Sequence, residues 1–296
     1  MNVVQTFEDV RAISEGSVAL VPTMGYLHEG HLSLIREASR LADTVVVSIF
    51  VNPLQFGEAR DLDTYPRDVD RDTALAAEAG ATVVFAPSAE YMYPDVPETT
   101  VSVGAVSEGM EGSARPGHFA GVATVVAKLF AGVQPHSAYF GRKDAQQLAV
   151  VSTMAADLSF PVTVTGLPVV RETDGLALSS RNVRLDGVSR ERARALSRGL
   201  MSAADAFEAG EESVATLKDI AAERMDSHDG VDVEYIELAD ARTASISSTL
   251  AGVQFLATAA RVGDVRLIDN VTFDSSTRTA DRGVRLAHPS ILYGGG

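Results

Sequence analysis

Apolar and polar positions follow two different patterns through the first 170 residues, short apolar runs and apolar positions at helical spacing. Short apolar runs rich in Val, Phe and Ile and bounded by Gly, Pro or Asp predict buried strands, at residues 18–21, 44–51, 82–86, 138–140 and 162–170. Between these runs, apolar positions recur at helical spacing, over residues 32–41, 69–79, 119–131 and 145–158. Strands that alternate with helices are typical of right-handed crossovers in a parallel sheet. The pattern therefore predicts an α/β fold with a Rossmann-like, doubly wound parallel sheet.

The character of the chain changes after residue 170. A polar loop, residues 171–184, leads into two long helical patterns at 190–209 and 214–226, and then into strand-like segments at 233–238, 254–261 and 265–271. The turn sequence Arg261-Val262-Gly263-Asp264 predicts that the last two strands are antiparallel neighbours. We therefore expect one domain of residues 1–170 and a smaller C-terminal α+β domain of residues 171–296. The final residues, 293–296, have little to bury and are expected to fray.

The helix at residues 119–131 is apolar nearly all round, which leaves two explanations open: deep burial or a subunit interface. The most apolar long window, residues 119–133, contains Lys128 and is shorter than the roughly 20 residues that cross a bilayer. The first nine residues carry no basic segment ahead of an apolar stretch, so no secretory signal is expected. These features favour a cytoplasmic location.

Composition removes several classes of function. The chain of 296 residues carries 25 basic and 40 acidic side chains, a formal charge of −15, which disfavours generic nucleic-acid binding. The absence of Cys excludes disulfides, thiolate zinc sites, iron–sulfur clusters and a cysteine nucleophile. No His, Asp and Glu residues are grouped at metal-ligand spacing, and the acidic run at residues 68–72 is expected to be a solvated helix face.

Candidate chemistry is expected in the loops after the strands, because ligands of open α/β sheets bind beyond the strands' C-terminal ends. The first predicted strand runs into Pro22-Thr23-Met24-Gly25-Tyr26-Leu27-His28-Glu29-Gly30-His31 and then into a helix. Histidines three apart should place both rings on one side of the helix start, beside backbone N–H groups that attract anions. The glycine spacing is close to that of a P-loop, but His31-Leu32 replaces Lys-Ser/Thr. The alternative is a turn with incidental histidines.

Two further loops carry polar side chains. Phe50-Val51-Asn52-Pro53-Leu54-Gln55-Phe56 follows the second strand and places two amides there, which suit a hydroxy acid. Alternatively, Asn52 caps its own backbone in a turn. Arg115-Pro116-Gly117-His118-Phe119 opens the apolar helix, and Arg115 is expected to face solvent unless this loop folds inward.

A lysine stands at the end of another predicted strand, in Phe140-Gly141-Arg142-Lys143-Asp144-Ala145-Gln146-Gln147. The chain has only three lysines, Lys128, Lys143 and Lys218. A compact cation at a strand end can follow a moving phosphoryl charge. The alternative for Lys143 is a surface pair with Asp144, which contributes little.

The loop at the domain junction contains Val170-Arg171-Glu172-Thr173-Asp174-Gly175-Leu176-Ala177-Leu178-Ser179-Ser180-Arg181-Asn182. Two hydroxyls and a guanidinium suit the oxygens of a polyphosphate. A serine-rich linker is the alternative, and it accounts for Ser179 and Ser180 but not for the whole string.

These strings resemble a known superfamily. His28-Glu29-Gly30-His31 is similar to the HIGH-type signature of nucleotidylyltransferases and class I aminoacyl-tRNA synthetases, in which paired histidines contact ATP phosphates. Residues 178–182 are similar to the second signature, the KMSKS-type loop, but lack its lysine, so the positive charge must come from Arg181 and Lys143. All five strings, in this order, resemble the pantoate–β-alanine ligase family; beyond them the C-terminal part matches only in size and pattern.

The resemblance implies an ATP-dependent condensation of (R)-pantoate with β-alanine to pantothenate, AMP and pyrophosphate through a pantoyl adenylate. It implies His31 as proton donor, with His28, Lys143 and Arg181 as further catalytic residues; the alternative is that His31 acts only as a cation. The hydroxyl-rich loop at the domain junction suggests a hinge, with the C-terminal domain closing over ATP as a lid. Mg²⁺ would be held mainly by the ATP phosphates, and a homodimer is expected. Gln55, Gln147 and Asn52 would bind pantoate, and Gln55 also β-alanine. The implied ATP-binding residues are Met24, Gly25, Tyr26, Leu27, His28, Glu29, Gly30, His31, Gly141, Arg142, Lys143, Asp144, Val170, Leu178, Ser179, Ser180 and Arg181.

Three other functions compete with this one. A nucleotidylyltransferase with a phosphorylated acceptor is disfavoured because the loop at residues 52–55 holds no cation. A tRNA-charging enzyme is disfavoured by the charge of −15 and by the lack of an anticodon-binding appendage. A catalytically silent ATP sensor would share the pocket, although intact His28, His31, Lys143 and Arg181 count against it.

Overall fold

The computed structural model describes residues 1–57, 62–226 and 230–293, and the chain divides into two compact units. The first unit comprises Met1–Gly104, Arg115–Gly141 and Val150–Leu167. The second comprises Ala105–Ala114, Arg142–Ala149 and Pro168–Gly296. The sequence suggested two continuous stretches that meet at residues 170 and 171. In the structure, two short segments from the earlier part of the chain cluster with the second unit.

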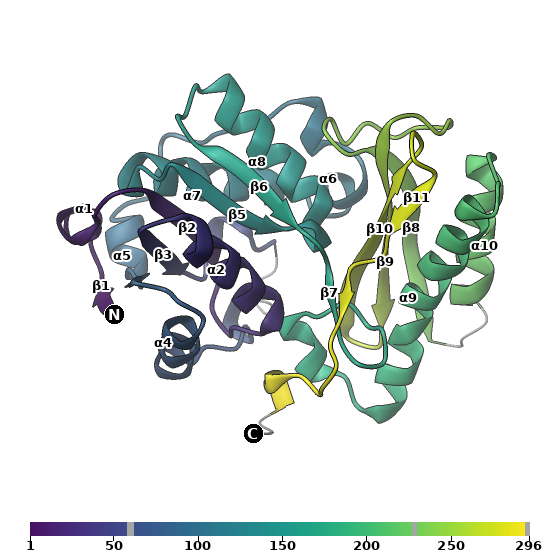
Figure 1. Cartoon of the computed structure of the whole chain (residues 1–296), viewed down its shortest axis with the longest axis horizontal. Helices are drawn as coiled ribbons and strands as arrows, with labels where there is room; N and C mark the ends of the chain where they lie inside the picture. The colour runs from purple at the N-terminus through teal and green to yellow at the C-terminus, as the bar shows by residue number, and fades with distance from the viewer. Residues whose placement is uncertain (58–61, 227–229, 294–296) are drawn as a thin grey trace. The chain divides into compact units, whose positions relative to one another are not determined.

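A six-stranded sheet forms the centre of the first unit, and every neighbouring pair in it is parallel. Its order is β1-β4-β3-β2-β5-β6, and the neighbours β3, β2, β5 and β6 are labelled in Figure 1. The strands run outward from the central neighbours β2 and β5, so the predicted doubly wound sheet is confirmed, with its switch point between these two strands. Their bounds are β1 Asn2–Val4, β2 Val18–Thr23, β3 Thr44–Ile49, β4 Val83–Phe85, β5 Ser137–Gly141 and β6 Thr163–Leu167.

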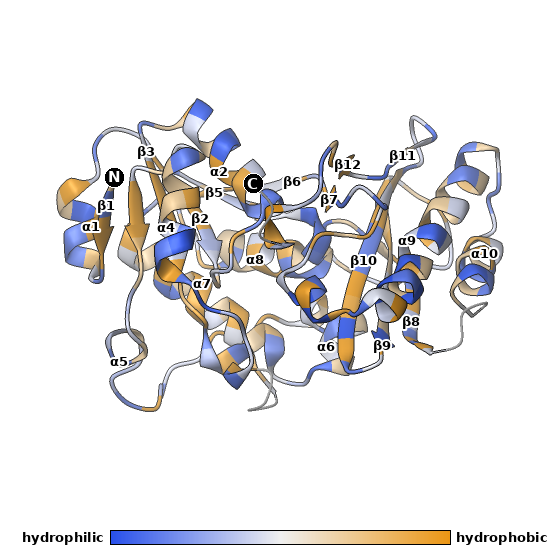
Figure 2. Ribbon diagram, turned by 90° about the horizontal axis from the view of Figure 1, so that it is seen from below, coloured by the Kyte–Doolittle hydropathy of each residue, from blue (hydrophilic) through white to orange (hydrophobic). Residues whose placement is uncertain are grey.

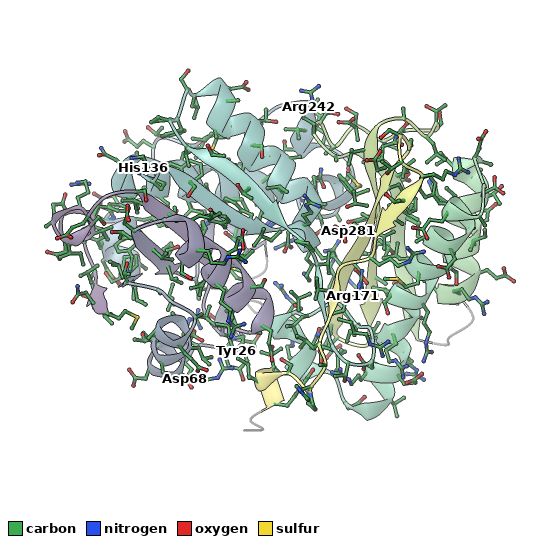
Figure 3. All side chains as sticks on the ribbon, viewed as in Figure 1. Tyr26, Asp68, His136, Arg171, Arg242 and Asp281 are labelled. Atoms are coloured by element: carbon green, nitrogen blue, oxygen red, sulfur yellow. The ribbon has the colours of Figure 1, made fainter. Side chains whose placement is uncertain are left out.

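Helices flank this sheet (Figure 1), and the central strand β3, all of whose residues are buried, is mostly orange in the hydropathy colouring of Figure 2. Helix α2 packs against β2, β3 and β5. His136, labelled in Figure 3, joins β5 to β2, because its Nδ1 accepts a hydrogen bond of 3.0 Å from the Val18 N–H. The helical segments are α1 Phe7–Ile13, α2 Glu29–Leu41, η1 Pro53–Gln55, α4 Val69–Glu78, α5 Ala89–Met92, α7 His118–Val133 and α8 Ala145–Asp157.

Helix α7 resolves the alternative that its apolar sequence left open. All but three of its 16 residues are buried within this chain. Gly132 lies so close to Phe7 of α1 that an added Cβ would stand 2.4 Å from the phenyl ring. The helix is therefore apolar all round because its own chain covers it.

An antiparallel sheet of order β11-β10-β9-β8 forms the second unit together with α9 and α10. The predicted turn is confirmed: Val262 pairs with Val265 across Gly263 and Asp264, and Gly263 has a φ of +57° that such turns require. The remaining elements are η2 Ala105–Ser107, α6 Met110–Ala114, η3 Arg142–Asp144, β7 Val170–Arg171, η4 Ser180–Arg184, α9 Gly187–Glu208, α10 Val214–Asp226, β8 Val231–Asp240, β9 Val253–Val262, β10 Val265–Asp274, β11 Thr279–Asp281, β12 Val284–Arg285 and η5 Ile291–Tyr293.

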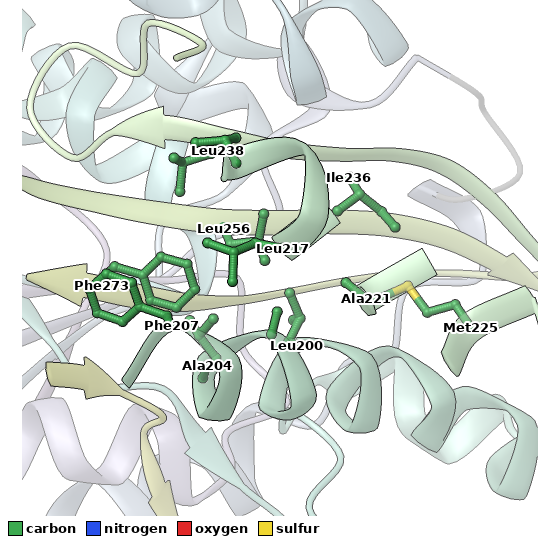
Figure 4. Close-up of a cluster of buried hydrophobic side chains, with 13 residues drawn as sticks. Leu200, Ala204, Phe207, Leu217, Ala221, Met225, Ile236, Leu238, Leu256 and Phe273 are labelled. Atoms are coloured by element: carbon green, nitrogen blue, oxygen red, sulfur yellow. The ribbon is translucent and has the colours of Figure 1, made fainter. Parts of the chain in front are cut away.

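The core of the second unit lies between α9, α10 and the inner face of this sheet (Figure 4). Phe207 of α9 stacks on Phe273 of β10 with ring centroids 4.5 Å apart and planes inclined by 14°. Leu200, Leu217 and Leu256 are fully buried beside them. Truncating one such leucine to alanine costs about 2–5 kcal/mol of stability, so this cluster contributes strongly to the stability of the second unit.

Three segments differ from the sequence-based expectations. The single strand expected at residues 162–170 is divided into β6 and β7, and Pro168, which has no N–H to donate, lies at the break. The hydrophobic pattern did not predict strand β1, because this strand has three residues and none of them is buried. Tyr293 does not fray, since its hydroxyl hydrogen-bonds Glu172 at 3.0 Å, whereas residues 294–296 lie outside the described part of the chain. Across the described residues, no helix has the length and apolar character to span a membrane.

Candidate active site

The turn after β2 presents two histidines at the start of α2. Gly25 and Tyr26 have φ angles of +83° and +50°, which reverse the chain immediately before the helix. The rings of His28 and His31 stack with centroids 4.1 Å apart and planes inclined by 30°. The His28 N–H also points to Nδ1 of His31, 3.4 Å away. Both rings therefore lie on one side of the helix start, as their spacing predicts, beside N–H groups that no helical carbonyl accepts.

A buried carboxylate lies beneath this turn. Asp72 of α4 is fully buried and accepts hydrogen bonds from the N–H groups of Tyr26 and Leu27, both at 2.6 Å. Burial raises the pKa of Asp72, and the two backbone hydrogen bonds oppose that shift. The expectation of a solvated acidic face at residues 68–72 is therefore wrong for Asp72, although Asp68, labelled near Tyr26 in Figure 3, and Asp70 are exposed. The sequence did hold a signal, because Asp72 shares a helical stripe with the buried Ala76.

The loop after β3 holds its amides in a network. The buried Asn52 donates through Nδ2 to Oε1 of Gln55 at 3.0 Å and to the Gly121 carbonyl at 3.1 Å. Its Oδ1 accepts from the Leu54 N–H at 3.3 Å and from the Tyr93 hydroxyl at 3.0 Å. Asn52 thus caps its own turn, which was the alternative interpretation of this string. Its position fixes the Gln55 side chain, whereas direct contact of Asn52 with a substrate stays a prediction.

Gln55 is also held from two other sides. Its Nε2 donates to the sulfur of Met24 at 3.1 Å, which connects this loop with the turn after β2. The backbone carbonyl oxygen of Gln55 accepts from Arg115 at 3.3 Å and lies 2.9 Å from Nδ1 of His118. The expectation that Arg115 faces solvent is wrong, because the loop before α7 folds inward onto this carbonyl. Burial raises the pKa of Tyr93, which closes the network through Asn52, to about 12.

The second unit contains the candidate lysine. Lys143 lies in η3, its side chain is only 18% exposed, and its Nζ lies 3.8 Å from Asp144. The Lys–Asp pair therefore exists, but it is partly buried rather than on the open surface. Asn270 of β10, which the sequence pattern did not single out, donates to the carbonyls of Arg142 and Lys143 at 2.9 and 2.8 Å. This buried amide fixes the backbone that carries Lys143.

The two neighbouring glutamines of α8 have different surroundings. Gln146 is buried, and its Nε2 donates to three carbonyls of the segment at residues 106–109, the shortest bond being 2.8 Å to Glu108. Gln147, the predicted pantoate ligand, is half-buried. Gln146 is therefore committed to the fold, which leaves Gln147 as the candidate for substrate.

The loop at residues 178–182 is built around Glu172. The Leu178 N–H donates to the Val170 carbonyl at 2.9 Å, and Ser179 caps η4 by accepting from the Arg181 N–H at 3.3 Å. Asn182 donates to Glu172 at 2.7 Å, and Arg190 and Tyr293 bind the same carboxylate at 2.6 and 3.0 Å. Ser179 and Ser180 are buried, and Arg181 is half-buried. This is an ordered structure with internal partners, not a linker.

Each unit thus gathers part of the predicted set. The first unit holds Met24, Gly25, Tyr26, Leu27, His28, Glu29, Gly30, His31, Asn52, Gln55 and Gly141. The second holds Arg142, Lys143, Asp144, Gln147, Val170, Leu178, Ser179, Ser180 and Arg181. Among the residues that the structure describes, no group of three or more His, Asp or Glu side chains is placed to hold a metal ion.

Comparison with known proteins decides the family. A model of the pantoate–β-alanine ligase family matches residues 2–272. The chain belongs to that family. A pantothenate synthetase of Heliobacterium modesticaldum is 52% identical over 87% of this chain and 92% of its own length. One from Nocardia farcinica is 51% identical over 86% of this chain and 79% of its own length.

Solved structures of this ligase family agree with the fold. A crystal structure of pantothenate synthetase from Thermus thermophilus superposes with a TM-score of 0.87 and 47% identity, covering 91% of this chain and 98% of that one. A pantoate–β-alanine ligase from Francisella tularensis, complexed with β,γ-ATP and β-alanine, gives a TM-score of 0.75 and 32% identity over 91% of this chain and 97% of that one. The predicted fold class, a parallel sheet with a smaller C-terminal domain, is therefore confirmed for the ligase family to which this chain belongs.

Proposed function

We propose that this chain condenses pantoate with β-alanine at the expense of ATP, giving pantothenate, AMP and pyrophosphate. The observation that carries the proposal is the family match over residues 2–272, which includes the stacked His28 and His31 at the start of α2. The Francisella relative, whose structure is described as complexed with β,γ-ATP and β-alanine, supports ATP and β-alanine as substrates. A transferase for a phosphorylated acceptor, a tRNA-charging enzyme and a silent sensor have no comparable support.

The first step joins a carboxylate to the α-phosphorus of ATP. An oxygen of pantoate attacks, the bond to the β-phosphate oxygen breaks, and pyrophosphate leaves with its electron pair. Because an anion must approach a polyanion, cations and N–H dipoles have to offset the repulsion. We assign this role to His28, His31 and the N-terminus of α2 in the first unit, and to Lys143 and Arg181 in the second. Both attacking groups belong to substrates, so no side-chain nucleophile is needed.

Magnesium fits this scheme as part of the nucleotide. The described residues offer no cluster that would hold the ion by themselves, whereas ATP phosphates are its ordinary ligands. Mg²⁺ would neutralise phosphate charge when bound. The remaining ATP contacts proposed here are Met24, Gly25, Tyr26, Leu27, Glu29, Gly30, Gly141, Arg142, Asp144, Val170, Leu178, Ser179 and Ser180.

The amides are assigned to the other two substrates. Gln55 offers a donor and an acceptor in a position fixed by Asn52, Arg115 and His118, which suits the hydroxyls and carboxylate of pantoate. Gln147 is proposed as a second pantoate ligand, and Gln55 also as a contact for β-alanine. In the second step the β-alanine amine attacks the acyl carbon, AMP leaves, and the amine proton must be removed. This step needs a deprotonated amine and no further ATP.

We also propose that the domain of residues 171–296 closes over ATP and protects the acyl adenylate from water. Small-angle scattering tests this closure: the radius of gyration should fall when ATP and pantoate are added together. An unchanged radius would rule the closure out. A homodimer in the cytoplasm completes the proposal, and light scattering coupled to gel filtration checks the oligomeric state directly.

Pyrophosphate release from ATP tests the activity. With pantoate alone, release should stop after about one equivalent per active site, because the adenylate stays bound; β-alanine should then allow turnover. Release without any acid would indicate plain hydrolysis, and release only with a phosphorylated acceptor would favour a different transferase. No release in the presence of both substrates would leave a silent ATP-binding protein.

A further inference from the structure

We propose that Asp72 of α4 is a positioning residue for the nucleotide: its carboxylate fixes the Tyr26–Leu27 backbone so that His28 and His31 are held ready for ATP. The inference rests on the proposed ATP-dependent function, and it adds a residue outside the string that carries the superfamily signature. Asp72 lies 41 positions beyond His31, in a run of acidic residues whose other members are typical of a solvated helix.

Both oxygens of the carboxylate bind the turn, and Nη1 of Arg71 also lies 3.3 Å from Oδ1. One oxygen of Asp72 accepts from the Tyr26 N–H and the other from the Leu27 N–H, each at 2.6 Å. Two successive N–H groups, one of them on a residue with positive φ, form a concave anion site of the kind that often binds phosphate. In this protein the chain's own carboxylate fills that site, so the turn has one stable shape before any nucleotide arrives.

The turn needs such support because its backbone is strained. Tyr26 has a φ of +50°, which is unfavourable for a residue with a side chain, and it follows Gly25 at +83°. Charge-assisted hydrogen bonds are stronger than neutral ones, and burial strengthens them further. Without the carboxylate the turn is free to relax toward ordinary φ values, and the rings of His28 and His31, two and five residues after Tyr26, would move with it.

Neighbouring contacts show that α4 and the turn fit each other closely. Arg71 donates from Nη1 to the Leu27 carbonyl at 3.1 Å, and its guanidinium lies 5.0 Å from the centre of the Tyr26 ring. A Cβ at Gly25 would stand 2.9 Å from Oδ2 of Asp72, so only glycine allows the carboxylate to come this near. Helix α4 therefore contacts the backbone and the side chain of the turn through two consecutive residues.

The substitution Asp72→Asn tests the role. Asparagine keeps the size of the side chain, but its NH₂ group would face one of the two N–H donors. The matched control is Asp70→Asn, the same change at an exposed position of the same helix. We expect the dissociation constant of ATP, measured by calorimetry, to rise about tenfold or more in Asp72→Asn and to stay within twofold in Asp70→Asn. The KM for β-alanine at saturating ATP should change little.

Amide NMR gives a readout that general destabilisation would not produce. In the unaltered protein the amide protons of Tyr26 and Leu27 should resonate at low field, as expected for short bonds to a carboxylate, and one of them should lose this shift in Asp72→Asn. If Asp72→Asn does not fold, Arg71→Met keeps the Asp72 side chain but removes both the bond to the Leu27 carbonyl and the ion pair with Asp72, and it should weaken ATP binding several-fold.

Unchanged ATP binding in folded Asp72→Asn, or in Arg71→Met where that variant replaces it, would overturn the role of this clamp. Because calorimetry needs no turnover, the result is separate from the proposed reaction. An unaltered protein that binds ATP but never releases pyrophosphate would contradict the proposed function and still leave the Asp72 comparison decisive.

Discussion

His28 and His31 stack face to face, with ring centroids 4.1 Å apart, at the N-terminus of α2. The stack makes the two imidazoles one structural unit, because each ring packs against a face of the other. Their position at a helix N-terminus adds the positive end of the helix dipole to whatever charge the rings carry. The pair is therefore the centre of the proposed phosphate site.

Replacing His31 by alanine separates charge stabilisation from proton donation. We expect kcat/KM for ATP to fall by about 10²–10³-fold, the usual effect of removing one well-placed donor. The pH–rate profile distinguishes the roles: if His31 donates a proton, the variant should lose the alkaline limb of the kcat profile, and an unchanged shape would remove the acid role. His288→Ala, at an exposed position, is the control and should keep full activity.

The sequence predicted the central elements of the fold well because they are long and strongly patterned. β2, β3 and α2 were found because apolar runs and helical periodicity coincide there with Gly and Pro boundaries. The histidine pair was found because three-residue spacing at a helix start has one geometric outcome. Short elements such as β1 were missed, since a three-residue edge strand without buried side chains leaves no apolar run.

The supporting residues of the site could not be read in the same way. Asp72 looked like one more charge on an acidic helix, and only the stripe it shares with Ala76 hinted at burial. Asn270 supports Lys143 from 127 positions away, and no local pattern encodes a contact over that separation. Arg115 was assigned to solvent because a sequence does not show which way a loop folds.

Gly121→Ala should weaken both stability and pantoate binding. A Cβ at this position of α7 would stand 2.3 Å from the Leu54 carbonyl oxygen and 2.7 Å from the Gln55 nitrogen, and both are backbone atoms. We expect a loss of about 1–3 kcal/mol in the free energy of unfolding, together with a higher KM for pantoate as Gln55 is displaced. Gly187→Ala, where an added Cβ meets nothing within 4 Å, should leave both quantities nearly unchanged. Equal behaviour of the two variants would contradict the close packing of α7 on η1.

Tyr93 makes stability depend on alkaline pH. Burial raises its pKa to about 12, whereas the unfolded chain titrates near the ordinary value of about 10. Below about pH 10 the hydroxyl is neutral in both states; as pH rises toward about 12 only the unfolded state has lost the proton, so the folded state loses stability. Urea denaturation measures the free energy of unfolding of the unaltered protein and of Tyr93→Phe. The unaltered protein's free energy of unfolding should fall relative to that of the variant between these pH values. A constant difference would contradict the assignment.

Glu172→Gln should loosen the loop that presents Ser179, Ser180 and Arg181. The carboxylate is 2% exposed and accepts from Asn182, Arg190 and Tyr293. We expect the free energy of unfolding to fall by about 1–3 kcal/mol. Breaking a fully buried ion pair would cost more, but Arg190 is partly exposed and keeps Asp174 as a partner. ATP should also bind more weakly. Glu191→Gln, on the exposed face of α9, should cost less than about 1 kcal/mol and leave ATP binding intact.

Transfer of isotope from pantoate to AMP tests the central claim most directly. Pantoate labelled with ¹⁸O in its carboxylate is turned over with ATP and β-alanine, and the masses of the products are measured by mass spectrometry. Attack of the carboxylate on the α-phosphorus followed by aminolysis predicts one ¹⁸O atom in each AMP and none in pyrophosphate. Unlabelled AMP, or ¹⁸O found in inorganic phosphate beside ADP, would contradict the adenylate and the role assigned to the histidine pair.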